Sequence, residues 1–303
     1  MARHVPHTEV LRRFNRSFTA RIGVLDDRFL GGDRPVGHAR MLFEIGAEGP
    51  DGASVRDLRA RLALDSGYVS RVLRSLEGDG LVTVSPDPDD GRQRRAVLTA
   101  DGWEEWRRLD ARSDELADRV LGGLGPRQRE RLAAALAEAD RLLAAAAASF
   151  DVVDPHDEDA LAAMRAYVAE LDDRFPGGFD PGGDWGLDGL APPHGVFVVV
   201  RLDGRVVGCG GVQTIGAGVG EVKRMWVDPA TRGMGLGPRL LAALEDHGRR
   251  LGHRVMRLDT NATLVEAIAM YRRAGYVEIE RYNDNPYPDL FFEKSLIPGG
   301  SAP

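Results

Sequence analysis

The sequence predicts two domains of different fold class: a mainly α-helical first domain over residues 1–149, and an α/β (α+β) second domain with a mixed sheet over residues 150–303. The length of 303 residues corresponds to about two domains. Apolar residues recur with a helical period through most of the first half, whereas β-type runs and helices alternate in the second. The charge also differs. In residues 1–150, 24 arginines balance 24 acidic residues, so the net charge of −7 falls to the second half.

The composition excludes several classes of protein. Hydrophobic residues make up 43% of the chain and charged residues 29%, which is typical of a globular protein and not of a disordered or fibrous one. No apolar run approaches the roughly 18 residues of a membrane span, and the N-terminus lacks the apolar core of a signal peptide. The only cysteine, Cys209, excludes an internal disulfide, and no Cys/His cluster has metal-site spacing. We therefore expect a soluble cytoplasmic protein with no membrane contact and no metal.

The first domain begins with helices whose apolar residues recur every three or four positions. The first helix covers residues 10–22. The second begins at Pro35, since proline favours the first turn of a helix. Ser54 and Asp57 have the spacing of a capping box before a third helix over residues 55–62.

A fourth helix and a hairpin follow. Asp65 or Ser66 caps the helix, which ends at Gly78 or Gly80. Two β-type runs over residues 81–85 and 95–99 then flank a turn-rich segment, and helices follow over residues 101–121 and 127–148. The inward face of the fourth helix is predicted to consist of Val69, Val72, Leu73 and Leu76.

Two short helices joined by a tight turn and followed by a hairpin are the parts of a winged helix-turn-helix. The second helix of such a motif fits the major groove of DNA, and cationic side chains at the hairpin tip can enter a minor groove or bind phosphates. A solvated helix face beside a purely structural hairpin is the alternative. The candidate DNA-binding residues are Ser66, Tyr68, Ser70, Arg71 and Arg74 on the helix and Arg92, Arg94 and Arg95 on the hairpin.

At this point residues 5–148 resemble the MarR family of regulators. The resemblance rests on residues 37–45 (GHARMLFEI) and on the segment from Leu81 to Gly102, in which Asp90 precedes Arg92 by two positions and Leu-Thr-Ala-Asp-Gly ends the hairpin. It implies a homodimer with interlocking terminal helices. It also implies two recognition helices and two wings that bind a pseudo-palindromic operator in double-stranded DNA.

The second domain alternates strands and helices. A helix over residues 157–173 leads into a Gly/Pro-rich loop over 175–193, which is either a lid or a flexible spacer. Strands over 195–202 and 205–214 are joined by Asp203-Gly204, a strong hairpin signal. The remaining elements are a strand over 221–227, a helix over 238–251, a strand over 255–259, a helix over 263–274 and closing strands over 276–281 and 290–295.

The segment from Val227 to Arg239 (VDPATRGMGLGPR) is the most informative in the chain. Alternating glycines between a strand and a helix let the backbone approach a ligand, and the unpaired N–H groups at a helix start attract phosphate oxygens. Arg232 adds a cation. The loop has neither dinucleotide-binding spacing nor a Walker lysine, so on spacing alone a simple turn is the alternative.

Residues 151–296 resemble the GNAT family of N-acetyltransferases. The resemblance rests on Arg232-x-x-Gly235-x-Gly237, followed by Asn261 and by Ala267-x-x-x-Tyr271-x-x-x-Gly275-Tyr276. It implies direct transfer of an acetyl group from acetyl-CoA to an amine, without an acyl-enzyme, so Cys209 is expected to be a small strand residue. The implied cofactor-binding residues are Trp226, Val227, Arg232, Gly233, Met234, Gly235, Leu236, Gly237, Asn261 and Tyr271.

The resemblance also implies catalytic roles. Tyr271 would protonate the departing thiolate, and the alternative is a core aromatic. Backbone N–H groups of Trp226 and Val227 would polarise the thioester carbonyl. Glu221 would act as the base, and the alternative is a solvated strand-end glutamate.

Substrate residues follow less directly from the sequence. The polar and aromatic loop over residues 282–289 lies beside the amine site in the family, which suggests Tyr282 and Asn283. Arg224 could meet a substrate carboxylate or form a salt bridge on the strand face. The negative charge of this half suits a small amine.

Three functions are therefore compatible with the sequence. The first is a bifunctional transcriptional regulator and acetyl-CoA-dependent N-acetyltransferase. The second is a MarR-type repressor whose second domain senses a ligand. The third is an acetyltransferase whose first half only dimerises.

Overall fold

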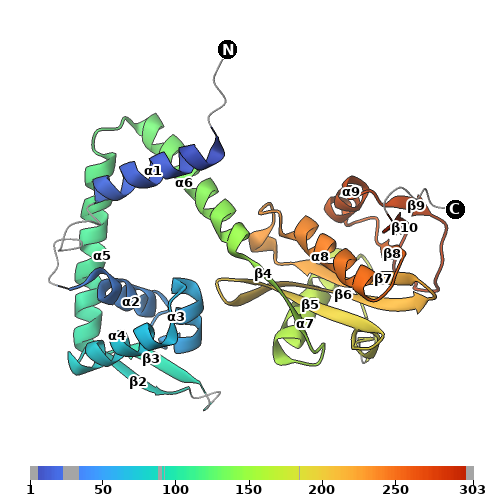
Figure 1. Ribbon diagram of the computed structural model, residues 1–303, viewed down its shortest axis with the longest axis horizontal. Helices are drawn as coiled ribbons and strands as arrows, with labels where there is room; N and C mark the ends of the chain where they lie inside the picture. The colour runs from blue at the N-terminus through green and yellow to red at the C-terminus, as the bar shows by residue number, and fades with distance from the viewer. Residues whose placement is uncertain (1–5, 23–33, 88–90, 92, 184, 298–303) are drawn as a thin grey trace. The chain divides into compact units, whose positions relative to one another are not determined.

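The protein is described by a computed structural model that covers residues 6–22, 34–87, 91, 93–183 and 185–297. The chain divides into two compact units, Met1–Ala137 and Glu138–Pro303 (Figure 1). The boundary falls inside a helix, α6 (Pro126–Ala147), whose last ten residues belong to the second unit. Among the described residues, no helix is long and apolar enough to cross a membrane.

The first unit is a helical body with a small winged sheet. Its core includes the inward face of α4, where Val69, Val72, Leu73 and Leu76 are all buried as predicted. The strands form a sheet in the order β1-β3-β2, in which β1 is a short strand that the sequence pattern did not predict. Its elements are α1 (His7–Ile22), α2 (Val36–Ala47), β1 (Ala53–Ser54), α3 (Val55–Leu62), α4 (Ser66–Gly78), β2 (Val82–Pro86), β3 (Arg94–Leu98) and α5 (Ala100–Leu121).

Local capping differs between the two short helices. Asp65 is the N-cap of α4, and its carboxylate accepts a hydrogen bond of 2.9 Å from the backbone N–H of Tyr68. Ser54 is the N-cap of α3, but its side chain makes no capping bond and its Oγ instead lies 3.4 Å from Gln93 Oε1. The capping box predicted for Ser54 and Asp57 is therefore wrong.

The second unit is a seven-stranded mixed sheet between helices, which confirms the predicted fold class. The strand order is β4-β5-β6-β7-β8-β10-β9, and among the strands that the structure describes only β7 and β8 pair in parallel. Its elements are β4 (Ser149–Val153), α7 (Glu158–Arg174), a 3₁₀ turn (Asp188–Leu190), β5 (Gly195–Leu202), β6 (Arg205–Gly216), β7 (Val219–Val227), a 3₁₀ turn (Pro229–Thr231), α8 (Leu236–Arg250), β8 (Val255–Thr260), α9 (Val265–Arg273), β9 (Val277–Ile279) and β10 (Leu290–Ser295).

Each face of this sheet has its own core. Fully buried Leu240 and Leu244 of α8 lie against one face, and fully buried Ala160 and Met164 of α7 lie against the other. β4 is an edge strand that pairs with β5, and the sequence analysis did not find it. The helices on both faces hold β7 and β8 in the centre of the unit, and these two strands carry the site.

Candidate functional site

The two parallel strands in the middle of the sheet separate. β7 and β8 pair only at Val219–Val255, Gly220–Met256 and Glu221–Arg257. Beyond Glu221, no described strand pairs with β7 on this side, so backbone groups near Trp226 and Val227 are available to a ligand. A cleft of about 420 Å³ lies here, lined by the end of β7, the glycine-rich loop, α7 and α9.

The glycine-rich loop joins the end of β7 to the start of α8. Gly233 and Gly235 have φ angles of 83° and 78°, a left-handed conformation that only glycine adopts without strain. Gly235 is the N-cap of α8, so Leu236 and Gly237 lie in the first turn of that helix, whose N–H groups lack partners within it. A Cβ at Gly235 would meet no atom within 4 Å. This open space at a helix N-terminus fits the pyrophosphate of acetyl-CoA.

Arg232 is held by a carboxylate that the sequence analysis did not identify. Its Nη2 donates to both oxygens of Glu170, at 2.6 and 2.5 Å, and its Nε donates to the carbonyl of Val227. Glu170 also accepts bonds from Trp226 Nε1 at 2.8 Å and from Arg174 Nη1 at 3.1 Å. Burial alone would raise the pKa of Glu170, but these donors hold it below its ordinary value. Glu170 therefore fixes three side chains along one wall of the cleft.

Tyr271 lies where the cleft meets a second, smaller pocket. Its side chain is buried, and its hydroxyl lies 3.9 Å from Met225 Sδ. Burial raises the pKa of Tyr271, so the phenol stays protonated at neutral pH. A protonated phenol beside the cleft has the chemistry of a general acid.

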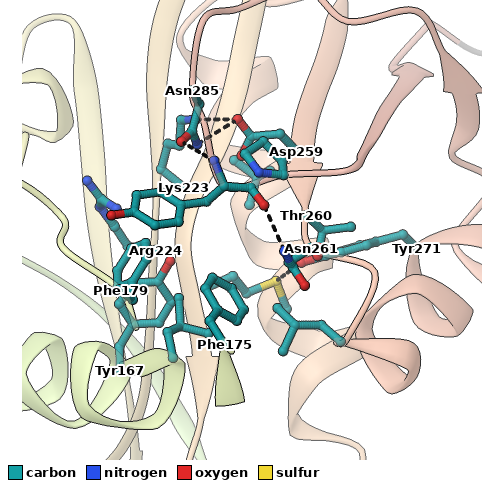
Figure 2. A pocket seen from close by; sticks show the side chains of 16 residues that line it. Tyr167, Phe175, Phe179, Lys223, Arg224, Asp259, Thr260, Asn261, Tyr271 and Asn285 are labelled. Atoms are coloured by element: carbon teal, nitrogen blue, oxygen red, sulfur yellow. Dashed lines mark hydrogen bonds and ion pairs between the residues drawn. The ribbon is translucent and has the colours of Figure 1, made fainter. Parts of the chain in front are cut away.

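The smaller pocket has a volume of about 80 Å³. Figure 2 shows Tyr167, Phe179 and Arg224 on one side of it and Asp259, Asn261 and Tyr271 on the other. An aromatic wall contributes Phe179 and Tyr287, whose ring centres are 4.9 Å apart. The cleft and the pocket share Tyr167, Leu171, Met225, Leu264 and Tyr271.

Glu221 does not line the cleft or the pocket. Its side chain is 3% exposed. Both of its oxygens are occupied: Oε2 accepts from Gln213 Nε2 at 2.6 Å, and Oε1 accepts from Tyr282 Oη at 2.7 Å and lies 2.9 Å from Lys223 Nζ. Asn283 also donates to Oε1, at 3.3 Å. The predicted substrate residues Tyr282 and Asn283 therefore hold Glu221 and do not line the pocket.

The carboxylate that does line the pocket is Asp259, at the end of β8. Its Oδ2 accepts from Lys223 Nζ at 3.0 Å, from Asn283 Nδ2 at 2.8 Å and from Asn285 Nδ2 at 3.3 Å. The sequence analysis missed Asp259, Lys223 and Asn285. One signal could have found Asp259, because it lies one residue before the carboxyl end of β8, which is parallel to β7, and ligands bind at the carboxyl ends of such strands.

Three of the predicted cofactor residues, and the single cysteine, are partly or fully buried, unlike the exposed glycines of the glycine-rich loop. Asn261 lines the smaller pocket and not the cleft, and its amide donates to the carbonyl of Tyr287 at 2.7 Å. Met234 packs against the core of the unit, and Leu236 is 1% exposed at the base of the cleft. Cys209 is buried and does not line either cavity, and burial raises the pKa of its thiol.

In the first unit, the α4 residues divide into two groups. Ser66, Ser70, Arg71 and Arg74 are exposed on the face opposite the core. Tyr68 is half-buried and packs so closely against α2 that a side chain at Gly37 would collide with its hydroxyl. Tyr68 therefore supports the helix packing more than it extends the exposed face.

The hairpin arginines also differ. Arg94 is exposed and donates to the carbonyl of Val84. Arg95 is paired with Asp87 at 2.8 Å and donates to the carbonyls of Asp51 and Gly52, so its guanidinium fixes the sheet. The prediction that it arms the hairpin tip does not match these contacts. Arg92 and Asp90 lie outside the described residues.

Comparisons with known proteins match both units. A model of the Acetyltransferase (GNAT) family matches residues 139–276, and a model of the MarR family matches residues 33–93. An "IAA acetyltransferase" of Azospirillum brasilense is 44% identical over 116 residues, which span 36% of this chain and 74% of that protein.

Two solved structures are each similar to a little under half of this chain. A GNAT-family acetyltransferase from Staphylococcus aureus Mu50 is 16% identical, with a TM-score of 0.43, over 49% of this chain and all of the other. A MarR-family transcriptional regulator from Rhodococcus sp. RHA1 is 20% identical, with a TM-score of 0.37, over 44% of this chain and 94% of the other.

Proposed function

The chain belongs to the GNAT family of acetyl-CoA-dependent N-acetyltransferases and also carries a MarR family domain, and from this premise we propose a bifunctional protein. Its second unit transfers an acetyl group directly to a small amine. Its first unit binds double-stranded DNA as a homodimer and regulates transcription.

The observation that carries the first part is the meeting of two cavities at Tyr271. The larger cleft begins at the glycine-rich loop and suits an elongated, phosphate-bearing molecule. The smaller pocket suits a small molecule. A thioester bound along the cleft and an amine bound in the pocket would meet beside Tyr271 and Met225, which line both cavities.

The residues divide the chemistry as follows. N–H groups of the loop and of the first turn of α8 hold the pyrophosphate, and N–H groups near Trp226 and Val227 polarise the thioester carbonyl. When bound, acetyl-CoA supplies the activated acetyl group. The amine nitrogen forms the new C–N bond as the C–S bond breaks, and Tyr271 gives its proton to the departing thiolate. The proton that the acetylated nitrogen loses then restores the Tyr271 phenol, so atoms and charge balance. Glu221, held by four donors, fixes Lys223 at the pocket and does not take part in proton transfer directly.

Two features support DNA binding by the first unit, and a third supports the homodimer. α4 exposes Arg71 and Arg74 beside Ser66 and Ser70, and Arg94 is exposed on the hairpin. Guanidinium groups arranged in this way suit phosphates and base edges. α1 leaves Val10 and Phe14 each 45% exposed, an apolar face that a second copy of the chain would cover.

Two measurements on the full chain test the proposal. Release of CoA thiol is followed with acetyl-CoA and a panel of small amines, and mobility shifts are recorded with the intergenic DNA beside the gene. Turnover with DNA binding supports the bifunctional protein. DNA binding without turnover supports a ligand sensor, and turnover without DNA binding reduces the first unit to a dimerisation module.

A further inference from the structure

The guanidinium of Arg224 has no carboxylate partner in the part of the chain that the structure describes. Its Nη2 donates to the carbonyl of Trp185 at 2.9 Å, and no Asp or Glu oxygen of the described residues lies within 4.0 Å. The two arginines of the neighbouring cleft, Arg174 and Arg232, are both paired with Glu170. The salt bridge on the strand face that the sequence left open for Arg224 is therefore not formed by these residues, and a charged donor with several N–H groups lines the smaller pocket.

The backbone at Arg224 directs this side chain. Its φ angle is 57°, a left-handed conformation that is strained for a residue other than glycine. It lies at a β-bulge, where the pairing of β6 with β7 shifts register between Cys209 and Gly211. A bulge re-aims a side chain. Here it directs the side chain of Arg224 towards the carbonyl of Trp185 and the hydroxyl of Tyr167. Burial raises the pKa of Tyr167, and the positive charge of Arg224 opposes this rise because it stabilises the phenolate.

A carboxylate lines the opposite side of the pocket. Asp259 is ion-paired with Lys223, which the buried Glu221 also binds from outside the pocket, so two carboxylates share one ammonium. Asp259 lines the pocket, and all of its described donors bind Oδ2, so none reaches Oδ1. Oδ1 is thus available to an ammonium group. Figure 2 shows Asp259 and Arg224 on different sides of the pocket, with Phe179 below Arg224 and Phe175 lower down between the two sides.

We propose that the substrate of this pocket is a small amine that also carries a carboxylate, of the kind found in an amino acid with an apolar side chain. Its carboxylate binds Arg224, its amino group binds Asp259 Oδ1 beside Tyr271, and its apolar body packs on the aromatic wall of Phe175, Phe179 and Tyr287. This inference rests on the proposed N-acetyltransferase function and adds the substrate class to it.

A matched panel of acceptors tests the inference. Phenylalanine, leucine and methionine are each assayed as the free amino acid, as its amide and as its decarboxylated amine, with acetyl-CoA and the full-length protein. A lost charge-assisted hydrogen bond corresponds to about a ten- to hundredfold effect, so kcat/KM for the amino acid should exceed that for the other two forms by this ratio. The wild-type ratio decides the question even if a variant fails to fold.

Variants then assign the preference to Arg224. In Arg224→Gln the ratio of amino acid to amide should collapse towards one, and Arg224→Lys should restore part of it. Arg254→Gln removes an exposed arginine that does not line the pocket and should keep the wild-type ratio. Equal kcat/KM for the three forms, or a preference for the amides, overturns the substrate class while the N-acetyltransferase function stands. Failure of every amine, by a protein that binds acetyl-CoA, overturns the proposed function itself.

Discussion

A substitution at Gly235, the glycine at the start of α8, can test the proposed CoA site, because its effect on stability and its effect on CoA affinity can be measured separately. Gly235 has a φ of 78°, and a Cβ there would meet no protein atom within 4 Å. Gly235→Ala should therefore cost only the left-handed backbone strain of an ordinary residue, about 1–2 kcal/mol. For a unit of this size, that corresponds to a fall in Tm of about 2–8 °C. The added methyl group, however, lies in the open space where the pyrophosphate would approach.

Gly252→Ala is the matched control. Gly252 has a φ of 87° and the same empty surroundings, but it lies beyond the other end of α8 and does not line the cleft. Thermal unfolding of both variants and calorimetric titration with CoA provide the comparison. We expect similar losses of Tm in the two variants, and a loss of CoA affinity of about ten- to a hundredfold in Gly235→Ala alone.

Two results would refute this reasoning. Equal CoA affinity in the two variants would show that the phosphates do not approach Gly235. A much larger loss of stability in Gly235→Ala than in Gly252→Ala would show that the loop has protein contacts that the described geometry lacks.

Three further predictions concern single side chains and one concerns the whole chain. Tyr271→Phe should lower turnover by about 10²–10⁴-fold with CoA affinity retained. Because burial raises the pKa of Tyr271, the phenol should keep its proton between about pH 7 and pH 10, and the wild-type rate should not fall over this range through loss of that proton. Glu170→Gln should lower the Tm at pH 7. The folded-state pKa of Glu170 lies below its ordinary value of 4.5, so the stability that its carboxylate contributes is present above pH 4.5 and is lost as the pH falls through the lowered pKa. The Tm values of the wild type and of Glu170→Gln should therefore converge in acid. Arg71→Ala and Arg74→Ala should each weaken DNA binding and reduce the slope of log binding constant against log salt concentration by about one, as measured by titration at several salt concentrations. Arg95→Ala should instead lower the Tm, because it removes the ion pair with Asp87. Because α6 continues from one unit into the other without a loop, saturating acetyl-CoA should change the affinity for operator DNA by a factor of a few to about a hundred. Operator DNA should change the affinity for acetyl-CoA by the same factor. Dissociation constants that are the same with and without the other ligand would contradict the coupling.

Periodicity and turn chemistry predicted most of the fold. β5 has the predicted bounds, 195–202, because its apolar run ends at the Asp203-Gly204 turn. β4 was missed because it is a five-residue edge strand whose alternation includes Asp151 and follows an alanine-rich helix without a break signal. β1, with two residues, is too short for any period to appear.

Side-chain partners were less predictable than elements. Arg95 of β3 and Arg74 of α4 were both predicted to bind DNA, yet Arg95 is bound to Asp87 and Arg74 is exposed. Likewise, the motif containing Arg232 gives no indication of Glu170, which lies 62 positions earlier in the chain. Which carboxylate an arginine meets depends on the packing of elements that are distant in sequence, and no local pattern encodes it.

The short stretch from Glu221 to Arg224 explains why one strand can serve both cavities. Pairing with β8 ends at Glu221, and the strained bulge at Arg224 follows three residues later. Strain of this kind persists only where surrounding contacts hold it, and here the contacts are the carbonyl of Trp185 and the side chain of half-buried Tyr167. A regular strand without the bulge would keep β7 in register with β6 and turn residue 224 to a different direction. The bulge thus presents a guanidinium to the small pocket, and the earlier end of the pairing with β8 leaves the N–H groups near Trp226 and Val227 open to the cleft.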